Sequence, residues 1–149
     1  MQPPKNSAEC RSELAFWVDS LARWELKFDG TFARPKSALK AASCYERFMR
    51  EVLPGVSYFV AVEANPSSPG HHIHATWAGC GSLRRKVIWK RWFGLYGRNL
   101  IEPIRGKRDA LDYVCKSLSY AAKEPIWWDV KLCNSDLWHR ASHGGVSTD

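Results

Sequence analysis

Hydrophobic and polar residues recur along this chain with two different periods, which predict helices and strands. Apolar residues recur at the three-to-four-residue spacing of a helix in four segments, residues 9–23, 35–53, 83–95 and 107–123. Shorter segments alternate or are rich in β-branched and aromatic residues, and these predict strands at 24–28, 56–64, 71–78, 99–104 and 126–132. Turn residues 65–70 are expected to join the second and third strands into a hairpin, and Asp29-Gly30 to end the first strand with a turn.

The order of these elements predicts an α+β fold. Strands that alternate with helices around a central hairpin indicate one antiparallel sheet with helices packed mainly on one face. With 149 residues, the chain is long enough to bury a core within one domain. We expect an N-terminal helical extension at residues 1–23, a main domain at 24–132 and a polar C-terminal tail at 133–149.

Composition indicates a cytoplasmic protein without a membrane partner. No apolar run reaches the roughly 18–20 residues that a membrane helix requires, and the polar residues 1–12 do not form a signal peptide. The 5 cysteines are an odd number, widely spaced and without a Cys-x-x-Cys pair, which favours reduced thiols over a disulfide framework or a zinc knuckle.

The predicted hairpin carries a candidate metal site. His72 and His74 are two residues apart on a strand, so they point to one face and can share a divalent metal ion. If the loop is symmetric, Ala64 pairs with His71 and Glu63 lies opposite His72, which adds a carboxylate to the two imidazoles. This face is expected to be the open one, and His71 points away from it. The opposite face is apolar and is expected to pack against helices, through Tyr58, Val60, Val62, Ile73, Ala75 and Trp77.

The helix predicted at 107–123 carries a second group of reactive side chains. At about 100° per residue, Tyr113, Lys116, Tyr120 and Lys123 fall within roughly 80° of one another. A tyrosine hydroxyl, with a pKa near 10, is a poor nucleophile at neutral pH. A lysine one turn away, or a metal ion that polarises the substrate, can compensate. Without such chemistry, these are ordinary half-buried helical tyrosines with extended lysines.

Positive charge is concentrated just before the tyrosine helix. The formal net charge is +7, and residues 83–108 hold nine bases and one acid, so this window is +8 and the rest of the chain −1. Such a segment indicates a polyanionic partner, and the aromatic residues among its lysines and arginines can stack on unpaired nucleobases. We expect the window to border the face that carries the tyrosine. Within the window, the residues expected to hold the phosphate backbone are Arg84, Arg85, Lys86, Lys90 and Arg91, and Lys27 is a further residue expected to bind DNA.

Together these motifs resemble the HUH endonuclease superfamily. The segment His72-Ile73-His74 is similar to its His-hydrophobe-His signature, and Tyr113-Val-Cys-Lys116 is similar to the Tyr-x-x-Lys motif of its rolling-circle replication initiators, the Rep proteins. The strand at 24–28 lies where that family has its first motif, and the resemblance covers residues 22–131. It implies a five-stranded antiparallel sheet, related to the RNA-recognition-motif and ferredoxin-like folds, with the HUH motif on a central strand.

The resemblance also implies a chemistry. Glu63, His72 and His74 would hold Mg²⁺ or Mn²⁺, and Tyr113 would attack a phosphate of single-stranded DNA at a replication origin. A 5′-phosphotyrosine forms and a free 3′-hydroxyl is released, which can prime synthesis by host helicase and polymerase. Lys116 would position a metal-bound water or neutralise charge near the phosphate. A phage- or plasmid-encoded initiator would act in the bacterial cytoplasm.

The sequence departs from the family pattern at one position and leaves alternatives open. Related phage initiators often carry a second tyrosine four residues after the first, where this chain has Ser117, so Tyr120 is the alternative nucleophile. The alternatives in function are a non-catalytic nucleic-acid-binding module on the same fold and a related relaxase or transposase. A further alternative is a zinc-binding regulator that uses His71, His72, His74 and Cys80.

Overall fold

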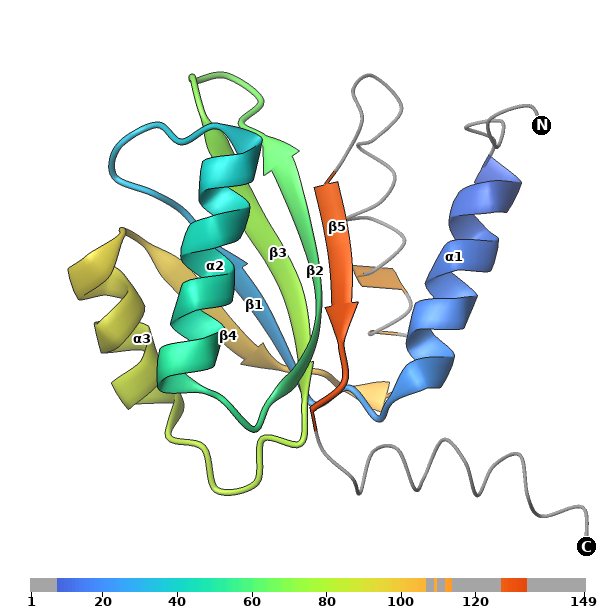
Figure 1. The fold of residues 1–149 in the computed structure, drawn as a ribbon. Coiled ribbons are helices and arrows are strands. Elements are labelled where there is room, and N and C mark those ends of the chain that lie inside the picture. The colour runs from blue at the N-terminus through green and yellow to red at the C-terminus, as the bar shows by residue number, and fades with distance from the viewer. Residues whose placement is uncertain (1–7, 107–108, 110–111, 114–126, 134–149) are drawn as a thin grey trace, which may run out of the picture.

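The computed structural model describes residues 8–106, 109, 112–113 and 127–133 (Figure 1). Its helices and strands, in chain order, are α1 (Ala8–Leu21), β1 (Leu26–Gly30), α2 (Ala38–Val52), β2 (Ser57–Ala64), β3 (His71–Ala78), α3 (Arg85–Leu95), β4 (Asn99–Pro103) and β5 (Trp127–Lys131). The described part of the segment expected to form the tyrosine helix, Asp109 and Asp112-Tyr113, is helical. Among the described residues, no helix has both the length and the apolar character needed to cross a membrane.

The five strands form one antiparallel sheet in the order β4-β1-β3-β2-β5. This confirms the predicted α+β class. The hairpin strands β2 and β3 lie inside the sheet, so both of their edges are hydrogen-bonded to neighbouring strands. Central strands have fixed backbones, and side chains that project from them are therefore held in defined positions.

The first strand is longer at its end than its sequence indicates. Asp29 and Gly30 were expected to form a turn, but both belong to β1. Asp29 pairs with His74 of β3 and with Leu100 of β4. Backbone pairing on both edges outweighs the turn preference of an Asp-Gly pair, and as a result the Asp29 carboxylate projects from the sheet.

One face of the sheet carries the main core under α2 and α3 (Figure 1). Helix α2 begins after Ser37, whose hydroxyl accepts a hydrogen bond from the Lys40 backbone amide at 3.2 Å. Stacked rings of Phe28 and Trp77 lie 4.9 Å apart at the centre of this core, and Trp92 of α3 packs edge-on against Phe28. The predicted apolar face is confirmed, since all of its members are buried there: Tyr58, Val60, Val62, Ile73, Ala75 and Trp77.

The opposite face, which was expected to be open, is partly covered by α1 (Figure 1). Ala15 and Val18 of α1 are fully buried against Phe59, Ala61 and Ala78, residues whose side chains share the face of the histidines. The expectation overlooked that this face is apolar at one end, where small and aromatic side chains provide a docking surface. The polar side chains of Glu63, His72 and His74 lie at the end of this face near the hairpin loop.

Gly30 provides a test of how tightly the main core packs. A Cβ atom added there would lie 2.7 Å from the Phe28 ring and 2.8 Å from the Trp92 ring. We expect Gly30→Ala to lower the free energy of unfolding by about 1–3 kcal/mol, because neither buried ring has room to move. A Cβ added at Gly94 would meet nothing within 4 Å, so Gly94→Ala should leave the free energy unchanged or raise it slightly. Urea unfolding followed by tryptophan fluorescence measures both, and equal midpoints for the two variants would contradict this packing.

Candidate metal centre

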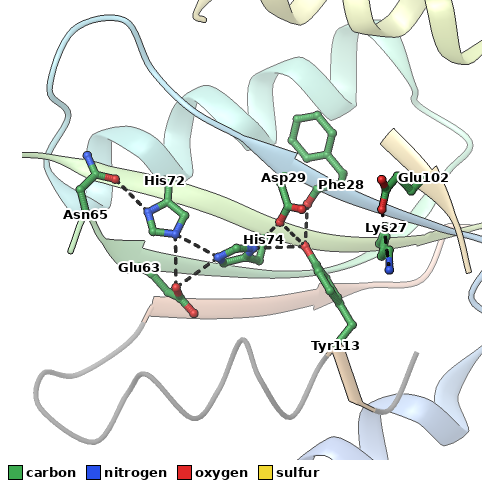
Figure 2. Close-up of polar contacts among 9 residues, drawn as sticks. All are labelled: Lys27, Phe28, Asp29, Glu63, Asn65, His72, His74, Glu102 and Tyr113. Atoms are coloured by element: carbon green, nitrogen blue, oxygen red, sulfur yellow. Dashed lines mark hydrogen bonds and ion pairs between the residues drawn. The ribbon is translucent and has the colours of Figure 1, made fainter. Parts of the chain in front are cut away.

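The register of the central hairpin brings Glu63, His72 and His74 together (Figure 2). Glu63 pairs with His72 and Ala61 with His74, as the symmetric loop predicted, so the three side chains share one face. The Nε2 atoms of the two histidines lie 2.9 Å apart, and Glu63 Oε2 lies 3.2 Å from His72 Nε2 and 3.1 Å from His74 Nε2. Three potential ligand atoms therefore form a nearly equilateral triangle.

The remaining hydrogen bonds orient both imidazoles with Nε2 toward the triangle. His72 Nδ1 contacts Asn65 Oδ1 at 2.8 Å, and Asn65 Nδ2 donates to the Pro69 carbonyl, which fixes the orientation of the amide. His74 Nδ1 donates to the Asp29 carboxylate. An acceptor at each Nδ1 indicates that this nitrogen carries a proton, so Nε2 is the atom of each ring that a metal ion would bind, in place of any proton held there. Carboxylate and amide oxygens that orient metal-binding imidazoles in this way are typical of protein metal sites.

The charges of the group also favour a cation. Burial raises the pKa of Glu63, but its bonds to His72 and His74 outweigh that effect and the pKa is lowered. Burial lowers the pKa of His74, and hydrogen bonds to Asp29 and Glu63 outweigh it and raise the pKa to about 9. The triangle thus attracts positive charge, whether a proton or a metal ion that replaces it.

Glu63 is buried, with 7% of its surface exposed, and its Oε1 atom has no hydrogen-bond partner among the described residues. A buried carboxylate oxygen without a partner is costly, by about 1–3 kcal/mol or more. A cation bound by this carboxylate would satisfy it. The orphaned oxygen is therefore an observation, separate from the triangle, that fits a metal ligand.

The size of the triangle fits a first-row or alkaline-earth divalent ion. Ligands about 2.1 Å from an octahedral ion lie about 3.0 Å from their neighbours. A tetrahedral zinc site with similar bond lengths would separate its ligands by about 3.3 Å. The observed separations of 2.9, 3.1 and 3.2 Å fall in this range. The group can hold a divalent ion, and its geometry does not select one element.

Tyr113 lies beside this group, on the far side of His74 (Figure 2). Its hydroxyl donates to Asp29 Oδ1 at 2.6 Å, and it lies 2.9 Å from the Phe28 carbonyl oxygen and 3.2 Å from His74 Nδ1. Burial and the nearby charge of Asp29 raise the pKa of Tyr113 well above 10. The hydroxyl is therefore protonated at neutral pH, and it already contacts a carboxylate that could accept its proton.

Lys27 places a positive charge beside the tyrosine. Its Nζ atom lies 5.9 Å from the centre of the Tyr113 ring, 3.4 Å from Asp109 Oδ1 and 3.8 Å from Glu102 Oε2. Two carboxylates share this lysine, which limits the charge it presents to a ligand. Its expected contact with DNA stays a prediction.

The basic helix lies elsewhere. Ile88 and Trp92 anchor α3 in the core on the face opposite the metal group, so the helical part of the basic window lies away from the tyrosine face. The apolar residues of α3 are the physical reason, since they dock only on the apolar side of the sheet. Its basic residues Arg84, Arg85, Lys86, Lys90 and Arg91 are exposed there. The last part of the window does border the tyrosine face, since Glu102 contacts Lys27 and Arg105 contacts Asp109.

The zinc alternative added His71 and Cys80 to the two histidines, and the structure places neither of them in the metal group. His71 contacts the Lys36 carbonyl oxygen and is absent from the metal group, as expected. Cys80 is absent from it too, and burial raises the pKa of its thiol to about 12, which disfavours a zinc-binding thiolate. Lys116 and Tyr120 lie outside the described residues.

Sequence reasoning missed Asp29 and Asn65, which orient the two imidazoles. Both were assigned to turns because Asp-Gly and Asn-Pro pairs favour them. The alternation of the first strand could have identified Asp29, since it continues the polar positions of Glu25 and Lys27. No pattern in the sequence could have identified Asn65, because its role depends on where the loop places its side-chain amide.

No protein-family model, curated protein or solved structure matches this chain. The site must therefore be interpreted from its own geometry. That geometry joins a partly buried triangle of one carboxylate and two imidazoles to a tyrosine hydroxyl through a single imidazole ring.

We expect the triangle to bind Mn²⁺, and His72→Ala or His74→Ala to abolish this binding, because two remaining ligands hold the ion poorly. At about 100 times its dissociation constant, the ion should stabilise the wild-type fold by about 2.7 kcal/mol. His71→Ala is the matched control, since its ring bonds to Lys36 instead, and it should retain binding. Calorimetric titration and thermal unfolding of the metal-stripped protein measure both effects. Equal loss in the His71 variant would contradict the proposed ligand set.

Proposed function

We propose that this protein is a metal-dependent nuclease of single-stranded DNA that nicks and rejoins strands through a tyrosine, and that it initiates rolling-circle replication. One observation carries the proposal. His74 contributes Nε2 to the ligand triangle, while its Nδ1 lies 3.2 Å from the Tyr113 hydroxyl. A phosphate held at the triangle would lie within reach of that hydroxyl, and the same motifs carry the HUH resemblance.

The proposed reaction is a transesterification at phosphorus. The Tyr113 oxygen attacks the scissile phosphate, a phosphorus–oxygen bond forms, and the bond to the 3′-oxygen of the preceding nucleotide breaks. The tyrosine then carries the 5′-phosphate, and the released 3′-hydroxyl takes up a proton. Reversal of these steps rejoins two strands. The bond energy is conserved in the adduct, so no additional reactant is required.

Each described side chain has a defined task in this reaction. Glu63, His72 and His74 would hold Mg²⁺ or Mn²⁺, which acts as a Lewis acid that stabilises developing charge on the phosphate. Asp29 accepts the proton of the Tyr113 hydroxyl, to which it is already hydrogen-bonded, and it keeps His74 oriented.

The charge of Asp29 suits this task. Burial raises the pKa of its carboxyl, but hydrogen bonds to His74 and Tyr113 outweigh burial and lower the pKa. The carboxylate is thus ionised at neutral pH and can accept a proton. Lys27, next to the tyrosine ring, would add only the part of its positive charge that Glu102 and Asp109 leave uncompensated. Lys116 retains the role that the motif implies, and that role stays a prediction.

The nucleophile can be tested by removing one oxygen atom. We expect Tyr113→Phe to retain the fold and metal binding and to lose the covalent adduct with DNA, because no other described hydroxyl is hydrogen-bonded to Asp29. Tyr120→Phe is the matched control and should still form adducts. Incubation with a pool of single-stranded oligonucleotides and Mn²⁺, followed by denaturing electrophoresis, detects the adduct. Adducts that persist in Tyr113→Phe and disappear in Tyr120→Phe would show that the second tyrosine is the nucleophile.

Asp29 can be tested with a substitution of the same shape. We expect Asp29→Asn to slow adduct formation by about 100-fold or more at saturating Mn²⁺, because an amide cannot accept the tyrosine proton. Asp109→Asn, which removes a carboxylate that contacts Lys27 instead, should have a much smaller effect. Single-turnover rates at several Mn²⁺ concentrations separate slower chemistry from weaker metal binding. A wild-type rate at saturating metal would exclude Asp29 as the proton acceptor.

A further inference from the structure

The outer surface of α3 carries a pair of stacked aromatic rings that no part of the proposed reaction uses. Trp89 and Phe93, one helical turn apart, stack with ring centres 5.1 Å apart and planes only 9° from parallel. Both are exposed, Trp89 by 38% and Phe93 by 52%. Exposed apolar side chains that adjoin one another, rather than being scattered singly, often mark a binding surface.

Hydrogen bonds hold Trp89 of this pair in place. Trp89 Nε1 donates to the Asn99 backbone carbonyl at 2.8 Å, and Asn99 Nδ2 donates to the Trp89 carbonyl at 3.0 Å. Two hydrogen bonds thus connect α3 to the start of the edge strand β4, at the position of Trp89. A ring that is already fixed loses little entropy when a planar ligand stacks on it.

Positive charge surrounds the pair. Arg85 and Lys86 precede Trp89 by four and three residues, and Lys90 precedes Phe93 by three, spacings that place neighbours side by side on a helix. The segment of α3 contains no acidic residue, and among the described residues none of its bases forms an ion pair. Arg85, Lys86 and Lys90 are all exposed.

We infer that this surface, Trp89 and Phe93 with Arg85, Lys86 and Lys90, is a second binding site for single-stranded nucleic acid. Unpaired nucleobases stack on the exposed rings, while the lysine and arginine side chains of α3 hold the phosphates. Single-strand-binding surfaces use this combination. The bases of a duplex are already stacked, and an acidic protein surface would gain little from parallel rings. The site lies on the opposite face of the sheet from the metal group and does not depend on it.

The site can be tested without metal, so that the nuclease proposal is not involved. A fluorescent 20-nucleotide oligothymidine is titrated with protein in EDTA, and anisotropy gives the affinity at several salt concentrations. We expect Phe93→Leu, which keeps an apolar side chain and breaks no hydrogen bond, to weaken binding about 5-fold or more without changing the salt slope. Arg85→Ala and Lys90→Ala should each reduce the slope of log K against log salt by about 0.7.

Two controls determine what the result means. Leu95→Ala removes a similarly exposed apolar residue of α3, and Trp128→Ala removes an exposed tryptophan of β5; neither should change the affinity. Binding of a duplex should be unaffected by Phe93→Leu. After irradiation of an oligonucleotide that contains 5-iodouracil, the cross-link should map to Trp89 or Phe93. Unchanged single-strand affinity in Phe93→Leu, equal loss for duplex, or cross-links confined to the metal face would overturn the inference, whether or not the nuclease proposal holds.

Discussion

The pairing register of β3 between β1 and β2 is the constraint on which the rest of the site depends. It places His74 opposite Asp29 on one side and opposite Ala61 on the other, with Glu63 two residues further along β2, opposite His72. His74 therefore lies between two carboxylates and contacts both through different ring nitrogens. Because the side chains of a strand alternate, a slip of one residue would turn both histidines to the other face, away from Asp29, Glu63 and Tyr113.

The apolar side of the same strands holds that register. Ile73, Ala75 and Trp77 alternate with the histidines and are fully buried under α2 and α3. A one-residue slip would expose the Trp77 ring and bury imidazoles among aromatic side chains, and burial of one large side chain is worth about 1.5–3 kcal/mol. The core thus specifies the positions of the polar side chains on the opposite face. Stability and the proposed chemistry depend on the same alternation.

Charge divides the molecule into two different surfaces. The polar end of one face gathers the carboxylates of Asp29, Glu63, Glu102 and Asp109 around two histidines and Lys27. The outer surface of α3 is basic and has no carboxylate within its helix. A DNA phosphate would be repelled from the acidic group unless a cation neutralises it, whereas α3 attracts a strand without metal. The two proposed DNA sites would consequently differ in their dependence on metal and on salt.

Local sequence determined much of the fold and part of the site. Periodicity predicted most of the elements, the α+β class and the pairing of Glu63 with His72, because alternation and a symmetric loop are local properties. Tertiary structure alone decided three other features. It kept Asp29 in β1 and beside Tyr113, placed α1 over the end of the face expected to be open, and docked α3 on the opposite face. Each depends on pairing or packing with a segment distant in the sequence, and the spacing of nearby residues does not decide which distant segment that is.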